Sequence, residues 1–227
     1  MKNKLNVIFE DNHIIVVEKP QNIPTQQDDT GDISVLDIVK DYLKIKYKKP
    51  GKVFAGLVHR LDRPVGGIMV FARTSKGASR LSATIRDREF GKKYLAVVRG
   101  DLYNEIGMMR DFLLKDKKNN KTKVVDIKTE GAKEAILDYE VLDKNQDMSL
   151  VLINLRTGRS HQIRVQFSSR GAPLYGDVKY GIEENDWRGN IALWSNEISF
   201  PHPVSKENMI FKNFPPNEFP WNQFNIK

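Results

Sequence analysis

VHRLDRPVGGIMVFART, residues 58–74, contains the features that decide the fold and suggest the chemistry. Residues 67–73, which are apolar as far as Ala72, have the length of one buried strand. Just before this run, Asp62 stands between Arg60 and Arg63. An opposite charge within a few ångströms favours the ionised form of a carboxyl group. The flanking arginines therefore predict that Asp62 is deprotonated and can act as a nucleophile without a separate base.

Two other interpretations of this stretch stay open. In the first, Asp62 caps a turn and both arginines are surface charges. In the second, the chain is a hydrolase that acts on nucleosides or glycans and releases free base. A glycosidase would pair the carboxylate with a second one roughly 5 to 9.5 Å away, whereas the motif-rich segments here supply arginines. Ordinary sugar hydrolysis is therefore disfavoured.

The composition indicates a globular protein with a polyanionic partner. The chain has 227 residues, 40% of them hydrophobic, which is enough for a sizeable core in one domain. Lys and Arg number 37 against 29 acidic residues, giving a formal net charge of +8. Such an excess favours nucleic acid over a membrane as partner. A basic surface that only aids solubility is the alternative.

Several classes of protein are disfavoured by what the sequence lacks. It has no cysteine, which excludes disulfides and thiolate chemistry, and its four histidines lack the short spacings of a zinc site. The first residues contain no apolar run of signal-peptide length, and no window approaches 18 apolar residues. We therefore expect a cytoplasmic enzyme that is neither exported nor membrane-spanning and that uses no metal.

Three segments have helical patterns. The first opens at Ser34, with Asp37 as its capping partner. The second follows Ser75, which we expect to be its N-cap. The third begins after Ser160 as N-cap and ends just before Gly171.

Strand patterns dominate the rest of the chain. Residues 6–20 predict two short strands around an Asp-Asn-His turn, and residues 92–100, KKYLAVVRG, predict another. Residues 121–200 are mostly strand-like, while the proline-rich segment from Pro201 is expected to wrap the surface. This order indicates an α+β fold around a mixed, largely antiparallel sheet with a few packed helices, in a single domain of residues 1–227.

Residues 155–181, LRTGRSHQIRVQFSSRGAPLYGDVKYG, form a second group of chemistry-bearing side chains. A helix N-terminus with adjacent arginines suits a phosphate or a ribose-phosphate backbone, so we expect substrate contacts here. For one residue, His161, a hydrogen-bonded turn or core position is the alternative. The expected contacts come from Arg159, His161 and Gln162.

Arg164 lies deeper in the same predicted helix, between two apolar residues. A partly buried arginine requires a carboxylate partner, and Asp62 is the expected one. The following GDVKYG segment, residues 176–181, predicts a tight structural loop.

Four segments in register resemble one known family, the RluA-type pseudouridine synthases. The similarity of order and spacing extends from about residue 7 to about residue 200. It implies isomerisation of uridine to pseudouridine within rRNA or tRNA, without a cofactor, on an α+β catalytic domain built around a mixed sheet. The segments are EDNHIIVVEKP (10–20), HRLDRPVGG (59–67), KKYLAVVRG (92–100) and GRSHQIRVQFSSRGAPLYGDVKYG (158–181).

The resemblance assigns roles residue by residue. Asp62 matches the catalytic aspartate of the family, and Tyr94 matches the tyrosine that packs against the target base. Arg164 matches the basic residue paired with the aspartate, and Arg60 the arginine that helps to flip the nucleotide. The reaction must break a C–N bond, turn the uracil and rejoin it through carbon. An ionised carboxylate that acts at the sugar, by attack or by proton abstraction, meets that need.

The chain departs from the family pattern at three places: Val65-Gly66-Gly67, Gln166-Phe167 and Trp194-Ser195. Trp194 is therefore either a new stacking surface or ordinary core. We expect no small N-terminal RNA-binding module and a monomer whose RNA affinity comes from the catalytic domain. Candidate contacts are the lysine runs 44–52 and 114–123, for which a solvated face is the alternative. A competing hypothesis is a catalytically inactive RNA-binding or RNA-chaperone protein with the same fold.

Overall fold

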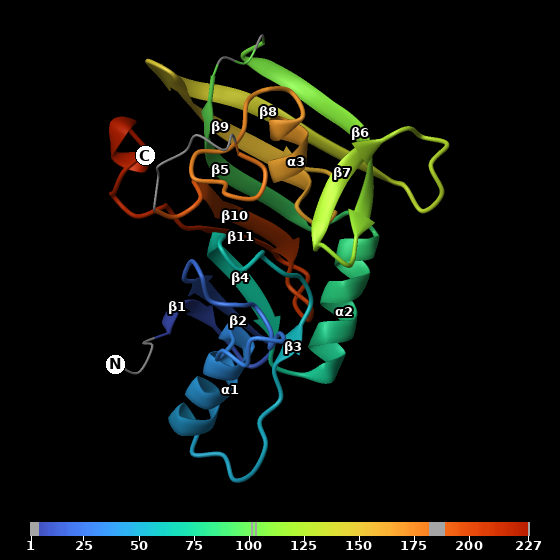
Figure 1. The fold of residues 1–227 in the computed structure, drawn as a ribbon. Helices are drawn as coiled ribbons and strands as arrows, with labels where there is room; N and C mark the ends of the chain where they lie inside the picture. Colours follow the sequence, from blue (N-terminus) through green and yellow to red (C-terminus); the bar gives the residue numbers. More distant parts are fainter. Residues whose placement is uncertain (1–4, 101, 103, 182–188, 227) are drawn as a thin grey trace. The chain divides into compact units, whose positions relative to one another are not determined.

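The computed structural model describes residues 5–100, 102, 104–181 and 189–226. The chain, drawn in Figure 1, forms two compact units, and each unit is built from two separate stretches of sequence. Unit 1 comprises Met1–Gly91 and Ser195–Asn213, and unit 2 comprises Lys92–Trp194 and Phe214–Lys227. None of the helices within the described ranges has the length and apolar character needed to cross a bilayer.

Unit 1 contains a sheet and two helices. The sheet runs in the order β1-β2-β4-β10, with β3 paired to β4 and β11 paired to β10. Each ladder of known register in this unit is antiparallel. The elements are β1 (Asn6–Glu10), β2 (Ile14–Lys19), α1 (Val35–Lys46), β3 (Gly56–Leu57), β4 (Gly66–Ala72), α2 (Ser75–Arg86), β10 (Leu193–Pro201, of which unit 1 holds the part from Ser195) and β11 (Asn208–Lys212).

The core of unit 1 forms around β4, whose seven residues are all buried. The expected strand at residues 67–73 is thus confirmed, one residue earlier than predicted. Its apolar side chains pack with those of β2 and β10 and with Leu81 of α2. Phe90 stacks on Phe200 in the same cluster, with ring centroids 5.1 Å apart. This cluster gives the loop before β4 a rigid base.

The start of β4 approaches β10 so closely that only glycine fits. Gly67 has φ +115°, a value that L side chains rarely adopt. A Cβ atom there would lie 2.3 Å from the carbonyl oxygen of Ser195 and 2.5 Å from its amide nitrogen. The absence of a side chain at residue 67 therefore sets where β4, and the loop before it, meets β10.

Unit 2 contains a second antiparallel sheet, ordered β5-β9-β8-β6-β7, and one short helix. In Figure 1, α3 lies beside the strands β6 to β9. The elements are β5 (Gly91–Arg99, in unit 2 from Lys92), β6 (Ile106–Asp116), β7 (Lys121–Val125), β8 (Lys133–Asn145), β9 (Met148–Leu155), α3 (Gln162–Ser168) and the 3-10 turn η1 (Trp221–Gln223). Together with unit 1, these elements confirm the predicted α+β fold with a largely antiparallel sheet.

The C-terminal segment is more than the surface wrap that the sequence predicted. Its first part adds strand β11 to β10. Its last part inserts Trp221 and Phe224 into a buried cluster with Leu95, Val97 and Trp194. The prolines that suggested an irregular surface segment separate short pieces that each bury apolar side chains.

The helix boundaries test the expected caps. At α1, Ser34 and Asp37 form the predicted capping box. At α2, the N-cap is Thr74, whose hydroxyl accepts from the amide of Gly77, so the assignment to Ser75 was wrong by one residue. At α3, the cap position belongs to His161 in the left-handed region, with φ +53°, rather than to Ser160.

The close approach at Gly67 predicts a large loss of stability for Gly67→Ala. Backbone strain costs about 1 to 3 kcal/mol, and displacing a packed strand costs a similar amount. We expect the free energy of unfolding, measured by urea denaturation, to fall by about 3 kcal/mol or more. Gly171→Ala is the control, because φ is +76° there but nothing lies within 4 Å of the added Cβ. It should lose only about 1 to 2 kcal/mol, and equal losses would contradict the account.

Candidate active site

Asp62 lies in unit 1, half-buried, on the loop that joins β3 to β4. Every backbone carbonyl from Leu61 to Val65 accepts a hydrogen bond, four of them from residues outside the loop and one from the Val65 amide within it. A loop with all its carbonyls bonded has little freedom to move. The Thr25 hydroxyl donates to the Leu61 carbonyl, and the Val65 amide donates to the Asp62 carbonyl. The Lys19 ammonium donates to the carbonyls of Arg63 and Val65, and the Gln21 side-chain amide donates to that of Pro64.

Lys19 is the centre of this arrangement. Its side chain is fully buried at the end of β2. Its Nζ donates to the carbonyls of Pro20 at 2.9 Å, Arg63 at 3.0 Å and Val65 at 2.7 Å. Three acceptors match the three N–H groups of an ammonium. The loop of Asp62 is therefore fastened to β2 by one buried cation.

The charge of Lys19 also acts on Asp62. Burial lowers the pKa of Lys19 to about 7, the attraction of the Asp62 carboxylate raises it, and repulsion by Arg63 lowers it. The three carbonyl bonds favour the ammonium, so we assign Lys19 as a cation next to Asp62. Sequence reasoning had given this electrostatic role to the flanking arginines alone.

Arg63 holds a neighbouring loop. Its Nη2 bonds to Asp28 at 3.2 Å, to the Thr30 hydroxyl at 2.6 Å and to Asp32 at 2.7 Å. These bonds lower the pKa of Asp32. The other flanking arginine, Arg60, is exposed. Nη2 of Arg63 is thus committed to the loop of residues 28–32, and the expectation that the flanking arginines ionise Asp62 stays a prediction.

Tyr94 and Arg164 lie in unit 2. Tyr94 is buried on β5, where it pairs with Ile153 of β9. Arg164 is buried on α3, as the sequence predicted. The structure supplies the guanidinium with a partner that sequence reasoning missed, namely Asp177. The predicted pairing with Asp62 joins residues of different units and stays a prediction.

The Arg164–Asp177 pair is bidentate and buried. Nε donates to Oδ2 at 2.8 Å and Nη2 to Oδ1 at 2.6 Å. The two side chains are only 5% and 0% exposed. Such paired bonds fix the plane of a guanidinium group. The GDVKYG loop, predicted to be structural, thus bears a carboxylate that holds a candidate site residue.

The other three candidates around α3 are held mainly by unit 2 itself. His161 Nδ1 lies 2.7 Å from the hydroxyl of Tyr180, which agrees with the alternative of a bonded turn histidine. Gln162 accepts from the Thr157 hydroxyl and the Arg159 amide, and its own amide donates to Ile136. Arg159 is exposed, and its Nε donates to the carbonyl of Glu134. These bonds explain why His161 and Gln162 are buried.

Metal ligation finds no support in the described part of the chain. There, no three His, Cys, Asp or Glu side chains are grouped so that they could hold an ion. Unit 1 holds Asp62 beside the buried Lys19 ammonium. Unit 2 holds Tyr94 and the Arg164–Asp177 ion pair.

A comparison with models of protein families identifies the family of this chain. A family model described as RNA pseudouridylate synthase matches residues 13–169, which is more than half of the chain. The chain belongs to this family. The predicted resemblance is therefore confirmed, and pseudouridine synthases are isomerases that convert uridine in RNA.

Relatives within the pseudouridine synthase family cover nearly the whole chain. The ribosomal large subunit pseudouridine synthase D of Borreliella burgdorferi is 31% identical over 219 residues, covering 94% of this chain and 65% of its own. The uncharacterized RNA pseudouridine synthase YjbO of Bacillus subtilis is 33% identical over 211 residues, covering 91% of this chain and 71% of its own. The chain thus spans about two thirds of the length of these relatives.

Solved structures agree on the fold. Human RNA Pseudouridylate Synthase Domain Containing 1 has a TM-score of 0.78 at 20% identity, covering 97% of this chain and 86% of its own. Human RNA Pseudouridylate Synthase Domain Containing 4 has a TM-score of 0.77 at 21% identity, covering 93% of this chain and 88% of its own. The pseudouridine synthase fold is therefore confirmed.

The departures from the family pattern are mostly core residues. Trp194 is 4% exposed and belongs to the cluster with Trp221, which decides for ordinary core. Phe167 is fully buried, and the Gln166 side chain donates to Asp111 at 2.6 Å. Val65 is buried at the end of the Asp62 loop. The side chains at these departures therefore lie in the interior of the two units.

The buried cation predicts that Lys19→Met is destabilising. Methionine fills a similar volume but leaves the Arg63 and Val65 carbonyls without their Lys19 donor, at about 1 to 3 kcal/mol each. Relief of the buried charge offsets part of this cost, so we expect a net loss of about 2 kcal/mol in urea unfolding. Lys212→Met is the control, since Lys212 is 59% exposed and its ion pair with Glu197 is 3.4 Å long. A Lys19 variant as stable as this control would refute the fastening role.

Proposed function

We propose that this chain isomerises uridine to pseudouridine in ribosomal RNA. The observation that carries the proposal is the Asp62 loop, in which five consecutive carbonyls are bonded and one buried ammonium lies beside the carboxylate. A protein that only bound RNA would gain nothing from holding a negative charge so rigidly. Catalysis benefits from a rigidly held charge, because a preorganised charge needs no reorganisation when the reaction takes place.

In this proposal, Asp62 acts on the sugar of the target uridine, by attack or by proton abstraction. The C–N bond breaks, the uracil turns, and a C–C bond takes its place. Lys19 supplies a positive charge next to the carboxylate and holds the loop in place. Tyr94 packs against the base, and Arg164 supplies a guanidinium of fixed orientation.

Ribosomal RNA is the favoured substrate because the Borreliella relative is named for the large ribosomal subunit. Transfer RNA is the second candidate from sequence reasoning. Work on either RNA would place the protein in the cytoplasm. We further propose that it acts as a monomer in one catalytic domain, and that Arg60, Arg63, Arg159, His161 and Gln162 line or support the RNA-binding surface.

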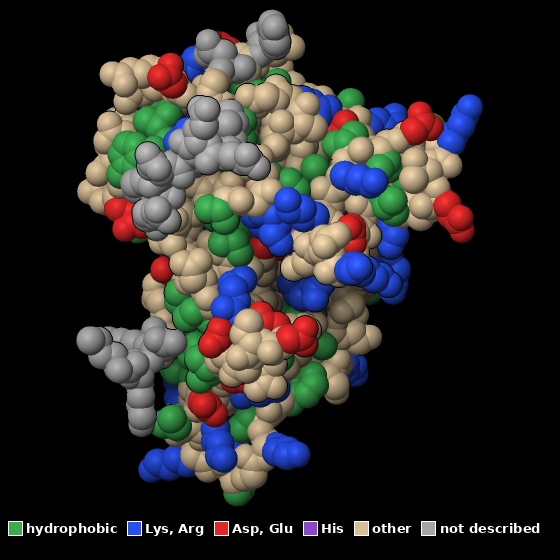
Figure 2. Space-filling model, in the orientation of Figure 1, with side chains coloured by type: hydrophobic (Ala, Val, Ile, Leu, Met, Phe, Trp, Pro, Cys, Tyr) green, Lys and Arg blue, Asp and Glu red, His purple; other side chains and the backbone are tan. Residues whose placement is uncertain are grey.

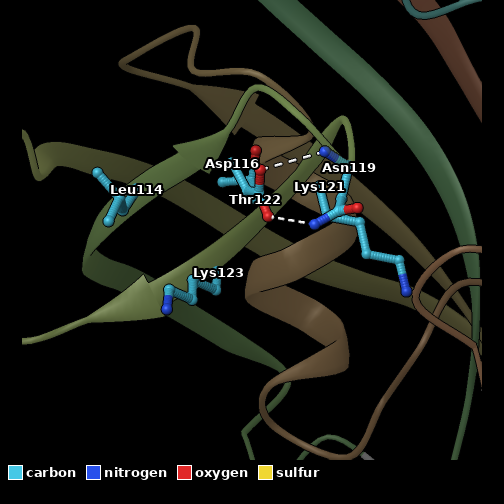
Figure 3. Close-up of a pocket in the computed structure, with 6 residues that line it drawn as sticks. All are labelled: Leu114, Asp116, Asn119, Lys121, Thr122 and Lys123. Atoms are coloured by element: carbon cyan, nitrogen blue, oxygen red, sulfur yellow. Dashed lines mark hydrogen bonds between the residues drawn. The ribbon is translucent and has the colours of Figure 1, made fainter.

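The β6–β7 hairpin is the stronger of the two candidate RNA contacts. Its basic side chains are exposed, and Figure 2 shows Lys and Arg groups on this part of unit 2. A hollow of about 810 Å³ runs along it, in which Asp116 accepts bonds from Asn119 at the turn (Figure 3). The lining residues are Leu114, Asp116, Asn119, Lys121, Thr122 and Lys123.

The lysine run at the end of α1 is partly committed within the protein. Lys46 Nζ bonds to Glu10 at 2.7 Å and to the Tyr42 hydroxyl at 2.9 Å. The lysine also lies over the rings of Tyr42 and Tyr47. These contacts favour the solvated-face alternative for at least this lysine, and the hairpin for RNA.

Tyr94 provides a test of the proposed chemistry. Wild type should produce pseudouridine in ribosomal RNA transcripts, detected by mass spectrometry. Tyr94→Phe keeps the ring and its stacking, worth about 1 to 3 kcal/mol per base, so it should bind RNA normally and lose mainly rate. Tyr94→Leu should lose both. Full activity in both variants would mean that Tyr94 is only a core residue. A wild type that binds RNA but forms no pseudouridine would favour the hypothesis of an inactive RNA-binding protein.

Two charge-matched triple variants separate the lysine runs. One replaces Lys117, Lys118 and Lys123 by Gln, and the other replaces Lys46, Lys48 and Lys49. The hairpin variant should reduce the slope of log affinity against log salt by up to about 0.7 to 0.9 for each phosphate that the protein no longer neutralises. The α1 variant should reduce it less, and turnover at saturating RNA should stay unchanged in both. The reverse order would assign the RNA contact to the α1 run.

A further inference from the structure

The loop that contains Asp177 is tied to the strand of Tyr94. The amide of Tyr175 donates to the Val97 carbonyl at 2.8 Å, and the amide of Arg99 donates to the Pro173 carbonyl at 2.9 Å. Both bonds join the loop to β5, the strand on which Tyr94 lies. A displacement of this loop relative to β5 would break main-chain hydrogen bonds.

Both carboxylate oxygens of Asp177 accept hydrogen bonds, and Oδ1 accepts two of them from amides of its own loop. Oδ1 accepts from Arg164 Nη2 at 2.6 Å, from the Lys179 amide at 3.0 Å and from the Tyr180 amide at 3.2 Å, and Oδ2 accepts from Arg164 Nε at 2.8 Å. The side chain is fully buried. The carboxylate is thus fixed by its own loop before it holds the guanidinium.

Tyr180 holds the same guanidinium from a second direction. Its ring centroid lies 5.2 Å from Arg164 Cζ. Its hydroxyl accepts from the Thr122 amide at 2.7 Å and lies 2.7 Å from His161 Nδ1. Burial raises the pKa of Tyr180, so the phenol stays neutral. An ion pair on one edge and an aromatic ring against the group leave Arg164 one orientation.

We propose that Asp177 is a positioning residue for the isomerisation. It fixes the orientation of the Arg164 guanidinium plane relative to strand β5. Arg164 and Tyr94 therefore contact the substrate in a constant mutual orientation. The two bonds of Asp177 are made to the Nε–Nη2 edge of the guanidinium. Because the pair is neutral as a whole, Arg164 contributes direction more than net charge. This role rests on the proposed function of Arg164.

Asp177→Asn tests the role through a split between kcat and KM. Asparagine keeps the shape and an oxygen for the loop amides but removes the charge and one acceptor. A misplacement of a catalytic group by about 1 Å can cost 10²-fold. We expect kcat to fall by about 10-fold or more, while KM and the RNA dissociation constant change less than about 2-fold.

Asp138→Asn is the matched control. Arg156 donates to Asp138 with the same pattern, Nε to Oδ2 at 2.6 Å and Nη2 to Oδ1 at 2.8 Å, but that arginine is 56% exposed. Its kcat should stay at the wild-type value. Equal kcat in the Asp177 and Asp138 variants, both folded, would overturn the proposal.

A double-mutant cycle separates positioning from general structural damage. If Asp177 acts through Arg164, then Asp177→Asn should change the single-turnover rate less than about 2-fold in an Arg164→Lys background. If it only maintains the fold, its effect should multiply with that of Arg164→Lys. The second result would overturn the proposal.

Nitrogen NMR of the arginine side chains gives a readout without turnover. Arg164 should show slow rotation about Nε–Cζ in wild type and fast rotation in Asp177→Asn, while Arg156 should rotate fast in both. Fast rotation of wild-type Arg164 would overturn the positioning role, whatever the activity. A wild type that makes no pseudouridine would overturn the proposed function itself. An active wild type with full kcat in Asp177→Asn would overturn the positioning role alone.

Discussion

The ammonium of Lys19 beneath the Asp62 loop is the interaction on which the candidate site depends. A buried charge without partners would cost several kcal/mol, and here three carbonyl groups and the Asp62 carboxylate offset that cost. The same bonds fix the loop. One buried cation therefore lies beside the Asp62 carboxylate and also fixes its loop, which explains why a buried lysine ends a strand that begins with four apolar residues.

Unit 2 uses the complementary arrangement. There a buried carboxylate, Asp177, is fixed by its own loop and holds a cation, Arg164. In each unit, a fully buried ion with no access to solvent orients a residue assigned to the chemistry.

Local features of the sequence predicted the fold well. The capping box of Ser34 and Asp37, the buried strand at β4 and the turn between β1 and β2 all follow from patterns within a few residues. The cap of α2 was missed by one residue because Thr74 and Ser75 are both good capping residues. The cap of α3 was missed because His161 occupies the position through its left-handed backbone and makes no side-chain cap bond, which the sequence does not signal.

The partners of the site residues could not be predicted in the same way. Lys19 meets the carbonyls of Arg63 and Val65, more than 40 positions away, and backbone carbonyls carry no signature in sequence. Asp177 was visible only as part of a tight loop. The burial of Trp221 and Phe224 was hidden by neighbouring prolines.

Pseudouridine formation by Asp62→Asn is the measurement that tests the central claim most directly. The change is nearly isosteric, the carbonyl bonds of the loop are untouched, and Asp177 keeps Arg164 paired, so the variant should fold, as circular dichroism would verify. Its RNA affinity should equal or slightly exceed that of wild type, because a negative charge leaves a polyanion site. Product should fall below detection. Pseudouridine above a trace from the folded variant would contradict the assignment of Asp62 as the reacting carboxylate.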